Sequence, residues 1–187
     1  MSVEAELKAV VREPDRVRSA LGQRSSEDID VYRDVYFDLP DHSFDAVGRE
    51  LRVREIEGAD GARRVLLTYK APAVHESGSK PEFETSIGDR DTAHAILSAL
   101  GYVELIAFEK HCRNYRFAVD DRDVQATLVT VPELDGSFLE VETIVSDGDV
   151  EAGLHVVRGV LVELGIDDAD LTTEQYTTTV RERRQRA

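Results

Sequence analysis

Cysteine, tryptophan and lysine are scarce in this sequence, and basic charge is outweighed by acidic charge. Of 187 residues, one is cysteine (Cys112), none is tryptophan and only four are lysine. A single cysteine excludes an intramolecular disulfide and any zinc site built on several cysteines. Lysine and arginine together number 23 against 38 acidic residues, so the formal net charge is −15. Such a field repels nucleic acid and anionic membranes, and we expect neither as a partner.

Long apolar runs are also missing, and the N-terminus shows no signal-peptide pattern. No stretch is long enough to span a bilayer, and a strand-like segment begins almost at once. Together with the lone cysteine, these absences predict a cytoplasmic protein. A length of 187 residues is enough for a proper core, and no linker or repeat divides the chain. We therefore expect one domain over residues 1–187.

Segment 3–9 alternates apolar and charged side chains. Apolar residues occupy its odd positions, whereas Glu4, Glu6 and Lys8 occupy its even positions. Successive side chains of a strand point to opposite faces, so these three charges share one face. For a single strand, the simplest interpretation is an amphipathic strand whose charged face is wet.

Similar patterns predict about eight strands with a few helices between them. We expect strands over 3–9, 30–38, 50–56, 63–70, 80–87, 105–119, 124–131 and 138–145. We expect helices over 14–22, over 92–100 after a cap at Asp91, over 150–164, and over 173–184 after a Thr172–Gln175 capping box. Antiparallel strands with few helices predict a single α+β domain built on a barrel.

Charges with the same alternation recur on one face of several later strands. The charged positions are Glu4, Glu6, Lys8, Arg52, Arg54, Lys70, Lys80, Glu82, Glu84, Lys110, Glu140 and Glu142. If the sheet closes, these rows turn inward and line a lumen. Burying a charge costs free energy unless the charge is paired or bound to a ligand, so such a lumen indicates a highly charged ligand.

The chemistry of these side chains indicates which ligand the lumen would bind. Carboxylates without histidine or cysteine favour a hard divalent ion, Mg²⁺ or Mn²⁺. Clustered lysine and arginine suit phosphate oxygens. A triphosphate that carries a divalent ion satisfies both sets. No phosphate-binding glycine-rich Gly-Lys-Ser/Thr loop occurs, so side chains rather than backbone would hold the phosphates.

Six short motifs occur in a fixed order along the chain. They are Glu4-x-Glu6-x-Lys8, Asp34-x-Tyr36-Phe37-Asp38, Leu51-Arg52-x-Arg54, Thr68-Tyr69-Lys70, Lys80-x-Glu82-x-Glu84 and Phe138-x-Glu140-x-Glu142. Together they resemble the signatures of the CYTH superfamily, the triphosphate tunnel metalloenzymes. That superfamily includes class IV adenylate cyclases, thiamine triphosphatases and inorganic triphosphatases. The resemblance covers almost the whole chain and implies a closed tunnel of eight antiparallel strands with flanking helices and two C-terminal helices.

The resemblance also implies a role for each charged residue. The triphosphate would be held by Lys8, Arg52, Arg54, Lys70, Lys80 and Lys110. One or two ions, Mg²⁺ or Mn²⁺, would be bound by Glu4, Glu6, Glu140 and Glu142. Glu4, Lys8 and Lys70 would be central to catalysis, and Glu82, Glu84 and Tyr36 would be accessory. The expected partner is a small-molecule triphosphate such as ATP, bound by a monomer or a homodimer.

Two positions depart from the family pattern. The strand motif K-x-R-x-x-Y aligns with 110–115, which puts Cys112 in place of the arginine and turns Arg113 to the opposite face. The family also has an acid before the turn that precedes the Phe138 motif, whereas segment 126–131, which includes Val129, has none. We expect a class IV cyclase-like reaction, with a triphosphatase as the alternative. A non-catalytic binder of triphosphate or polyphosphate stays open as a third possibility.

Overall fold

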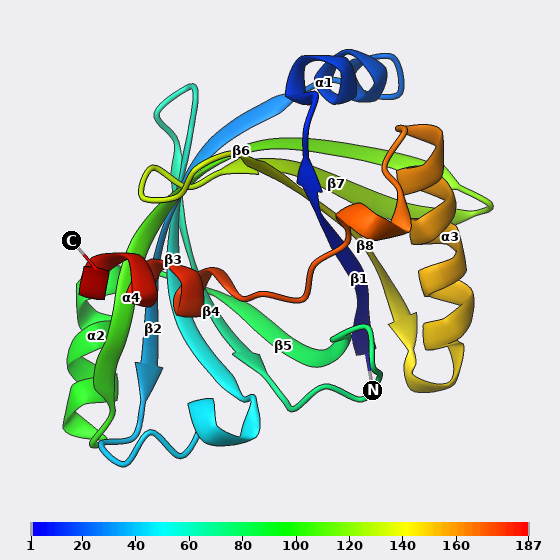
Figure 1. Cartoon of the computed structure of the whole chain (residues 1–187). Coiled ribbons are helices and arrows are strands. Elements are labelled where there is room, and N and C mark those ends of the chain that lie inside the picture. Colours follow the sequence, from blue (N-terminus) through cyan, green and yellow to red (C-terminus); the bar gives the residue numbers. More distant parts are fainter. Residues whose placement is uncertain (1, 187) are drawn as a thin grey trace.

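Eight antiparallel strands close into a barrel in the computed structural model, which describes residues 2–186 (Figure 1). Around the barrel the order is β1-β5-β4-β3-β2-β6-β7-β8. The strands are β1 (Ser2–Val11), β2 (Asp28–Asp38), β3 (Glu50–Gly58), β4 (Arg63–Lys70), β5 (Lys80–Ile87), β6 (Val103–Val119), β7 (Arg122–Thr130) and β8 (Ser137–Ser146). The predicted α+β barrel is therefore confirmed, and several strands extend one or two residues beyond their expected ends.

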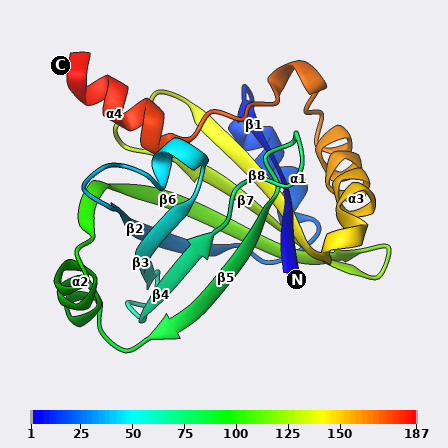
Figure 2. The same ribbon diagram turned by 90° about the horizontal axis from the view of Figure 1, so that it is seen from below.

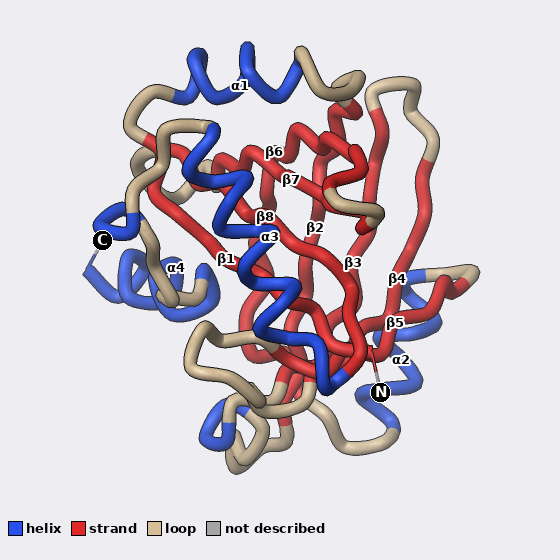
Figure 3. Tube along the Cα trace, turned by 90° about the vertical axis from the view of Figure 1, so that its right-hand side faces the viewer, coloured by secondary structure: helices blue, strands red, loops and turns tan. Residues whose placement is uncertain are grey.

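Four α-helices lie outside the barrel wall or at its mouth. They are α1 (Pro14–Gly22), α2 (Arg90–Ala99), α3 (Val150–Glu163) and α4 (Tyr176–Arg186). Helix α3 lies across β1 and β8 (Figure 3), and α2 lies on the other side of the barrel (Figure 2). None of the described helices is long and apolar enough to cross a membrane.

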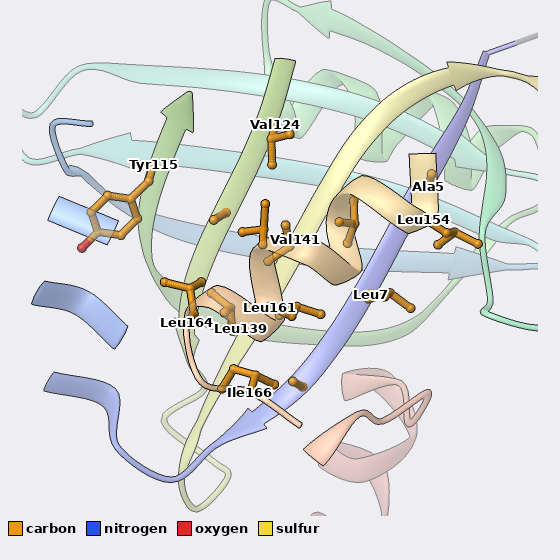
Figure 4. Close-up of a cluster of buried hydrophobic side chains, with 14 of the residues drawn as sticks. Ala5, Leu7, Tyr115, Val124, Leu139, Val141, Leu154, Leu161, Leu164 and Ile166 are labelled. Carbon is orange, nitrogen blue, oxygen red and sulfur yellow. The ribbon is translucent and has the colours of Figure 1, made fainter. Parts of the chain in front are cut away.

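The main hydrophobic core lies between the outer face of the barrel and the helices. The apolar side chains of β1, among them Ala5 and Leu7, point away from the lumen and pack beneath α3 (Figure 4). Gly153 lets α3 approach closely, because a Cβ at this position would lie 2.9 Å from Ala5 Cβ. The helices thus cover the apolar face of β1, and its charged face is left to line the barrel interior.

Two helix starts differ from the sequence prediction. Asp89, not Asp91, caps α2, because its side chain accepts a hydrogen bond from the Thr92 amide at 2.7 Å. The last helix begins at Tyr176 rather than at 173, and no Thr172–Gln175 capping box forms. Tertiary contacts hold the preceding segment extended, since the Thr172 amide donates to the Lys8 carbonyl at 2.9 Å. That segment crosses the barrel opening (Figure 1).

Glu27 connects α1 with the long strand β6, and its ionisation makes the stability of the fold depend on pH. Hydrogen bonds from Arg18 lower the pKa of Glu27 to about 2, with help from Tyr115 and Arg113. A carboxylate whose pKa is lower in the folded than in the unfolded state stabilises the fold fully at pH values above its unfolded pKa of 4.5. This contribution is lost as the pH falls towards the folded pKa of about 2.

We therefore expect Glu27→Gln to be less stable than wild type at pH 7 and to lose stability less steeply on acidification. Urea unfolding at pH 6 and at pH 3 measures this difference. Glu13→Gln is a control, because Glu13 is exposed and pairs only with Arg16 three residues away. Equal acid sensitivity of Glu27→Gln and wild type would contradict the assignment.

Candidate functional site

A charged cavity of about 530 Å³ lies inside the barrel. All the residues predicted from the sequence to form the site line it: Glu4, Glu6, Lys8, Tyr36, Arg52, Arg54, Lys70, Lys80, Glu82, Glu84, Lys110, Glu140 and Glu142. The pairing of β1 with β8 sets Glu6 opposite Glu142 and Lys8 opposite Glu140. Register and strand alternation, rather than loops, therefore position these side chains.

Three of the four predicted metal ligands form a cluster. Oxygens of Glu4, Glu6 and Glu142 lie within 4.8 Å of one another. The fourth, Glu140, lies instead 3.6 Å from the ammonium of Lys110. The cluster offers only carboxylate oxygens, which is the donor set of a hard divalent ion such as Mg²⁺ or Mn²⁺.

Crowding of the carboxylates changes their acidity. Burial, with repulsion from Glu4 and Glu140, raises the pKa of Glu6 to about 7. Burial and the same kind of repulsion raise the pKa of Glu142 well above its ordinary value. Burial also disfavours ionised Glu4, but contact with Lys70 outweighs it and brings the pKa of Glu4 to about 2. A bound cation would relieve this repulsion, so the donor set fits a metal ion.

The cations of the cavity differ in how firmly they are already paired. Arg54 donates through Nε and Nη2 to Asp34 at 2.6 Å each, in a buried bidentate pair. Lys80 donates to the Gly48 carbonyl at 3.0 Å and to Glu50 at 2.6 Å. These two cations are fixed at the cavity wall by their own partners.

Arg52 is held less completely than Arg54 and Lys80 by the described residues. Its Nη2 reaches the Thr68 hydroxyl at 3.2 Å and lies 3.7 Å from Glu84. Its Nε is buried without a hydrogen-bond partner among the described residues. A buried guanidinium donor without a partner is costly, and an anionic ligand in the cavity would satisfy it.

Tyr176, at the start of α4, brings two lysines together and was not in the predicted site. The ammonium groups of Lys8 and Lys110 lie 4.4 and 4.6 Å from the centre of its ring. Lys8 also contacts the carbonyl of Glu174. The signal that could have found Tyr176 is the Gln175-Tyr176 pair, which stands where CYTH sequences usually have Ser-Tyr. Asp34 was likewise visible as part of a motif but without a role.

At the two positions that depart from the family pattern, uncharged side chains stand in place of the expected arginine and acid. Cys112 and Val129 are buried together with Tyr176 in a hydrophobic cluster. Burial raises the pKa of the Cys112 thiol to about 12, which makes it a poor nucleophile. As expected, Arg113 points away from the cavity; the structure shows that it binds Glu27 there. From β7 the cavity receives Gln125 and Thr127, so no acid of that strand lines it.

The CYTH domain profile matches residues 2–176. The chain belongs to the CYTH family. CYTH proteins are generally metal-dependent enzymes that act on triphosphates, and their known activities include adenylate cyclase and triphosphatase. None of the curated proteins matches this chain.

Solved structures share the fold of this CYTH chain over nearly its full length. The PH1819 protein from Pyrococcus horikoshii is 26% identical with a TM-score of 0.81, covering 96% of this chain and 98% of that protein. A candidate adenylate cyclase from Vibrio parahaemolyticus is 20% identical with a TM-score of 0.76, covering 96% and 97%. An adenylyl cyclase candidate from Hippeastrum with a dominant triphosphatase activity is 17% identical with a TM-score of 0.65, covering 97% and 96%.

Proposed function

We propose that this CYTH domain binds an organic triphosphate with a divalent metal ion and breaks one of its phosphoanhydride bonds. A class IV cyclase-like reaction is the form we favour: the ribose 3′-hydroxyl of ATP attacks the α-phosphorus, and pyrophosphate leaves. Hydrolysis, in which water attacks a terminal phosphorus, is the alternative at the same site. The observation that carries the proposal is a carboxylate cluster set beside clustered cations in one enclosed lumen.

Each group of residues has a role that follows from its chemistry. Glu4, Glu6 and Glu142 would hold Mg²⁺ or Mn²⁺, which neutralises phosphate charge and polarises the bond that breaks. Lys8, Lys70 and Lys110 would bind phosphate oxygens as point charges, and Arg52 would do so through its free Nε. The same side chains would hold the triphosphate in one orientation and exclude bulk water from it.

Product analysis tests this proposal. Purified protein is incubated with ATP, thiamine triphosphate or tripolyphosphate, each with Mg²⁺ or Mn²⁺, and products are resolved. Cyclic AMP with pyrophosphate supports the cyclase, and orthophosphate supports the triphosphatase. Thermal stabilisation without any product would show a binder and overturn the proposed catalysis. Glu142→Gln, which removes one carboxylate charge from the cluster, is expected to lower turnover at least about a hundredfold.

Gln125 provides a prediction about metal affinity. It lies opposite Glu142 in the β7–β8 register, and its Nε2 donates to Glu142 Oε1 at 3.2 Å. This hydrogen bond orients the carboxylate and leaves its second oxygen for an ion. We expect Gln125→Ala to weaken Mn²⁺ binding about tenfold, measured by electron paramagnetic resonance of free Mn²⁺, whereas Gln125→Glu should strengthen it. Unchanged Mn²⁺ affinity in both variants would contradict this role.

A further inference from the structure

Two aliphatic side chains interrupt the charged lining of the lumen, at a place where Arg64 also lines it. On β3, Ile56 follows Arg52 and Arg54 on the face that lines the cavity, and on β4, Leu66 precedes Lys70 on the same face. Ile56 and Leu66 are the only aliphatic side chains that line the cavity in the described part of the chain. Both belong to neighbouring strands and to one hydrophobic cluster, so they form one apolar surface rather than two scattered contacts.

The register places this apolar surface beside Arg54, two residues from Arg52 on the same face of β3. Leu66 pairs with Arg54 across β3 and β4, and with Ser86 across β4 and β5. Ile56 is buried, whereas Leu66 is only partly buried and keeps surface facing the cavity. A ligand anchored at the cations could therefore extend onto Leu66 while its phosphates stay in the charged part.

Among the described residues, the cavity beneath the C-terminal segment offers no aliphatic surface. Apart from the ring of Tyr176, its lining there is hydroxyl, amide and charge, from Thr172, Thr173, Gln175 and Thr177 together with Lys80. An organic group of mixed polarity gains from covering apolar surface, in proportion to the area removed from water. Binding of such a group is thus most favourable where it covers the exposed side of Leu66.

The aromatic rings of the cavity each already contact a neighbouring side chain. Arg54 lies 4.4 Å from the centre of the Tyr32 ring. Tyr36 stacks on Phe108 with 5.8 Å between centroids, and Lys8 and Lys110 lie over the ring of Tyr176. Ile56 and Leu66, in contrast, offer aliphatic surface.

We propose that Ile56 and Leu66 form the subsite for the organic group of the substrate, so that the substrate class is an organic triphosphate rather than inorganic tripolyphosphate. This inference rests on the proposed function. It predicts that an organic triphosphate binds more tightly than tripolyphosphate, because only the organic ligand covers the Leu66 surface. Ser86 lies opposite Leu66, lines the same cavity and supplies a hydroxyl for a ring that carries heteroatoms.

Leu66→Gln tests the proposal, since it replaces an apolar side chain by a polar one of similar size without adding charge. Dissociation constants with Mg²⁺ are measured by calorimetry for ATP, GTP, thiamine triphosphate and tripolyphosphate. For the organic ligand that binds best, we expect about tenfold weaker binding to Leu66→Gln and a less than twofold change for tripolyphosphate. Leu66→Met keeps the apolar surface and should leave both constants as in wild type.

The outcomes separate this inference from the proposed function. If tripolyphosphate binds and Leu66→Gln changes the organic and inorganic ligands equally, or changes neither, the subsite is overturned while the triphosphate site stands. The subsite is also overturned if tripolyphosphate binds wild type as tightly as every organic ligand. If no ligand binds wild type, the proposed function fails and the subsite fails with it.

Discussion

Replacing Lys70 with methionine is expected to lower turnover at least about a hundredfold and to abolish stabilisation by triphosphate. The Lys70 ammonium contacts Glu4 and lies 2.8 Å from Glu82, so it neutralises one member of the carboxylate cluster and a second carboxylate of the cavity. Neighbouring carboxylates raise the pKa of Lys70 well above its ordinary value although burial lowers it, so the group is charged at any working pH. Its removal takes away one phosphate ligand and leaves a buried carboxylate, Glu4, and a partly buried one, Glu82, without their counter-charge.

Arg33→Met is the matched control for Lys70→Met. Arg33 also lies on a barrel strand, but on the outer face, where it pairs with three carboxylates: Glu57 at 2.9 Å, Glu109 at 3.3 Å and Glu55 at 3.5 Å. Loss of these exposed pairs should leave turnover and ligand-induced shifts of the melting temperature unchanged. Steady-state kinetics and thermal shifts with Mg²⁺ and ATP measure both variants. A Lys70→Met protein that behaves like Arg33→Met would remove Lys70 from the site.

Asp34→Ala is expected to have the largest effect on stability. Asp34 is fully buried and is held by Arg54 through two hydrogen bonds of 2.6 Å. Breaking a buried ion pair leaves an uncompensated charge and costs about 3–5 kcal/mol of unfolding free energy. For a chain of this size, that loss lowers the melting temperature by roughly 6–20 °C. Calorimetric unfolding measures it.

Asp28→Ala serves as the control on the same strand. Asp28 and its partner Arg116 are 61% and 53% exposed, and their atoms lie 3.1 Å apart. Exposed pairs of this kind contribute about 0–1 kcal/mol. If Asp34→Ala costs no more than Asp28→Ala, the Asp34–Arg54 pair does not stabilise the barrel.

The alternation of polar and apolar residues was enough to predict the barrel and the lining of its cavity. A strand has a strict period of two, so Glu4, Glu6 and Lys8 had to share a face wherever the strand lay. That Glu6 and Lys8 lie opposite Glu142 and Glu140 of β8 is a finding of the structure, because closure of the sheet alone does not fix the register. Local propensity was less reliable at helix ends, where tertiary hydrogen bonds to Lys8 overrode the expected cap at Thr172.

The pairing of charges inside the cavity could not be predicted from the sequence. Which carboxylate takes which cation depends on the tilt and register of strands that are distant in the chain. Arg54 resembles Arg52 in its motif, yet Asp34 holds Arg54, while Nε of Arg52 has no hydrogen-bond partner within residues 2–186. Likewise Glu140 and Glu142 share a motif, but only Glu142 joins the cluster with Glu4. Long-range geometry, rather than residue type, separates these roles.

Calorimetric titration of tripolyphosphate, with and without Mg²⁺, tests most directly whether the lumen binds phosphates and metal together. The carboxylate cluster repels phosphate until a cation is bound, so we expect Mg²⁺ to tighten tripolyphosphate binding at least about tenfold. Glu142→Gln should reduce this coupling. No binding of tripolyphosphate under either condition, or binding of equal strength with and without Mg²⁺ in wild type, would contradict a joint metal and triphosphate site.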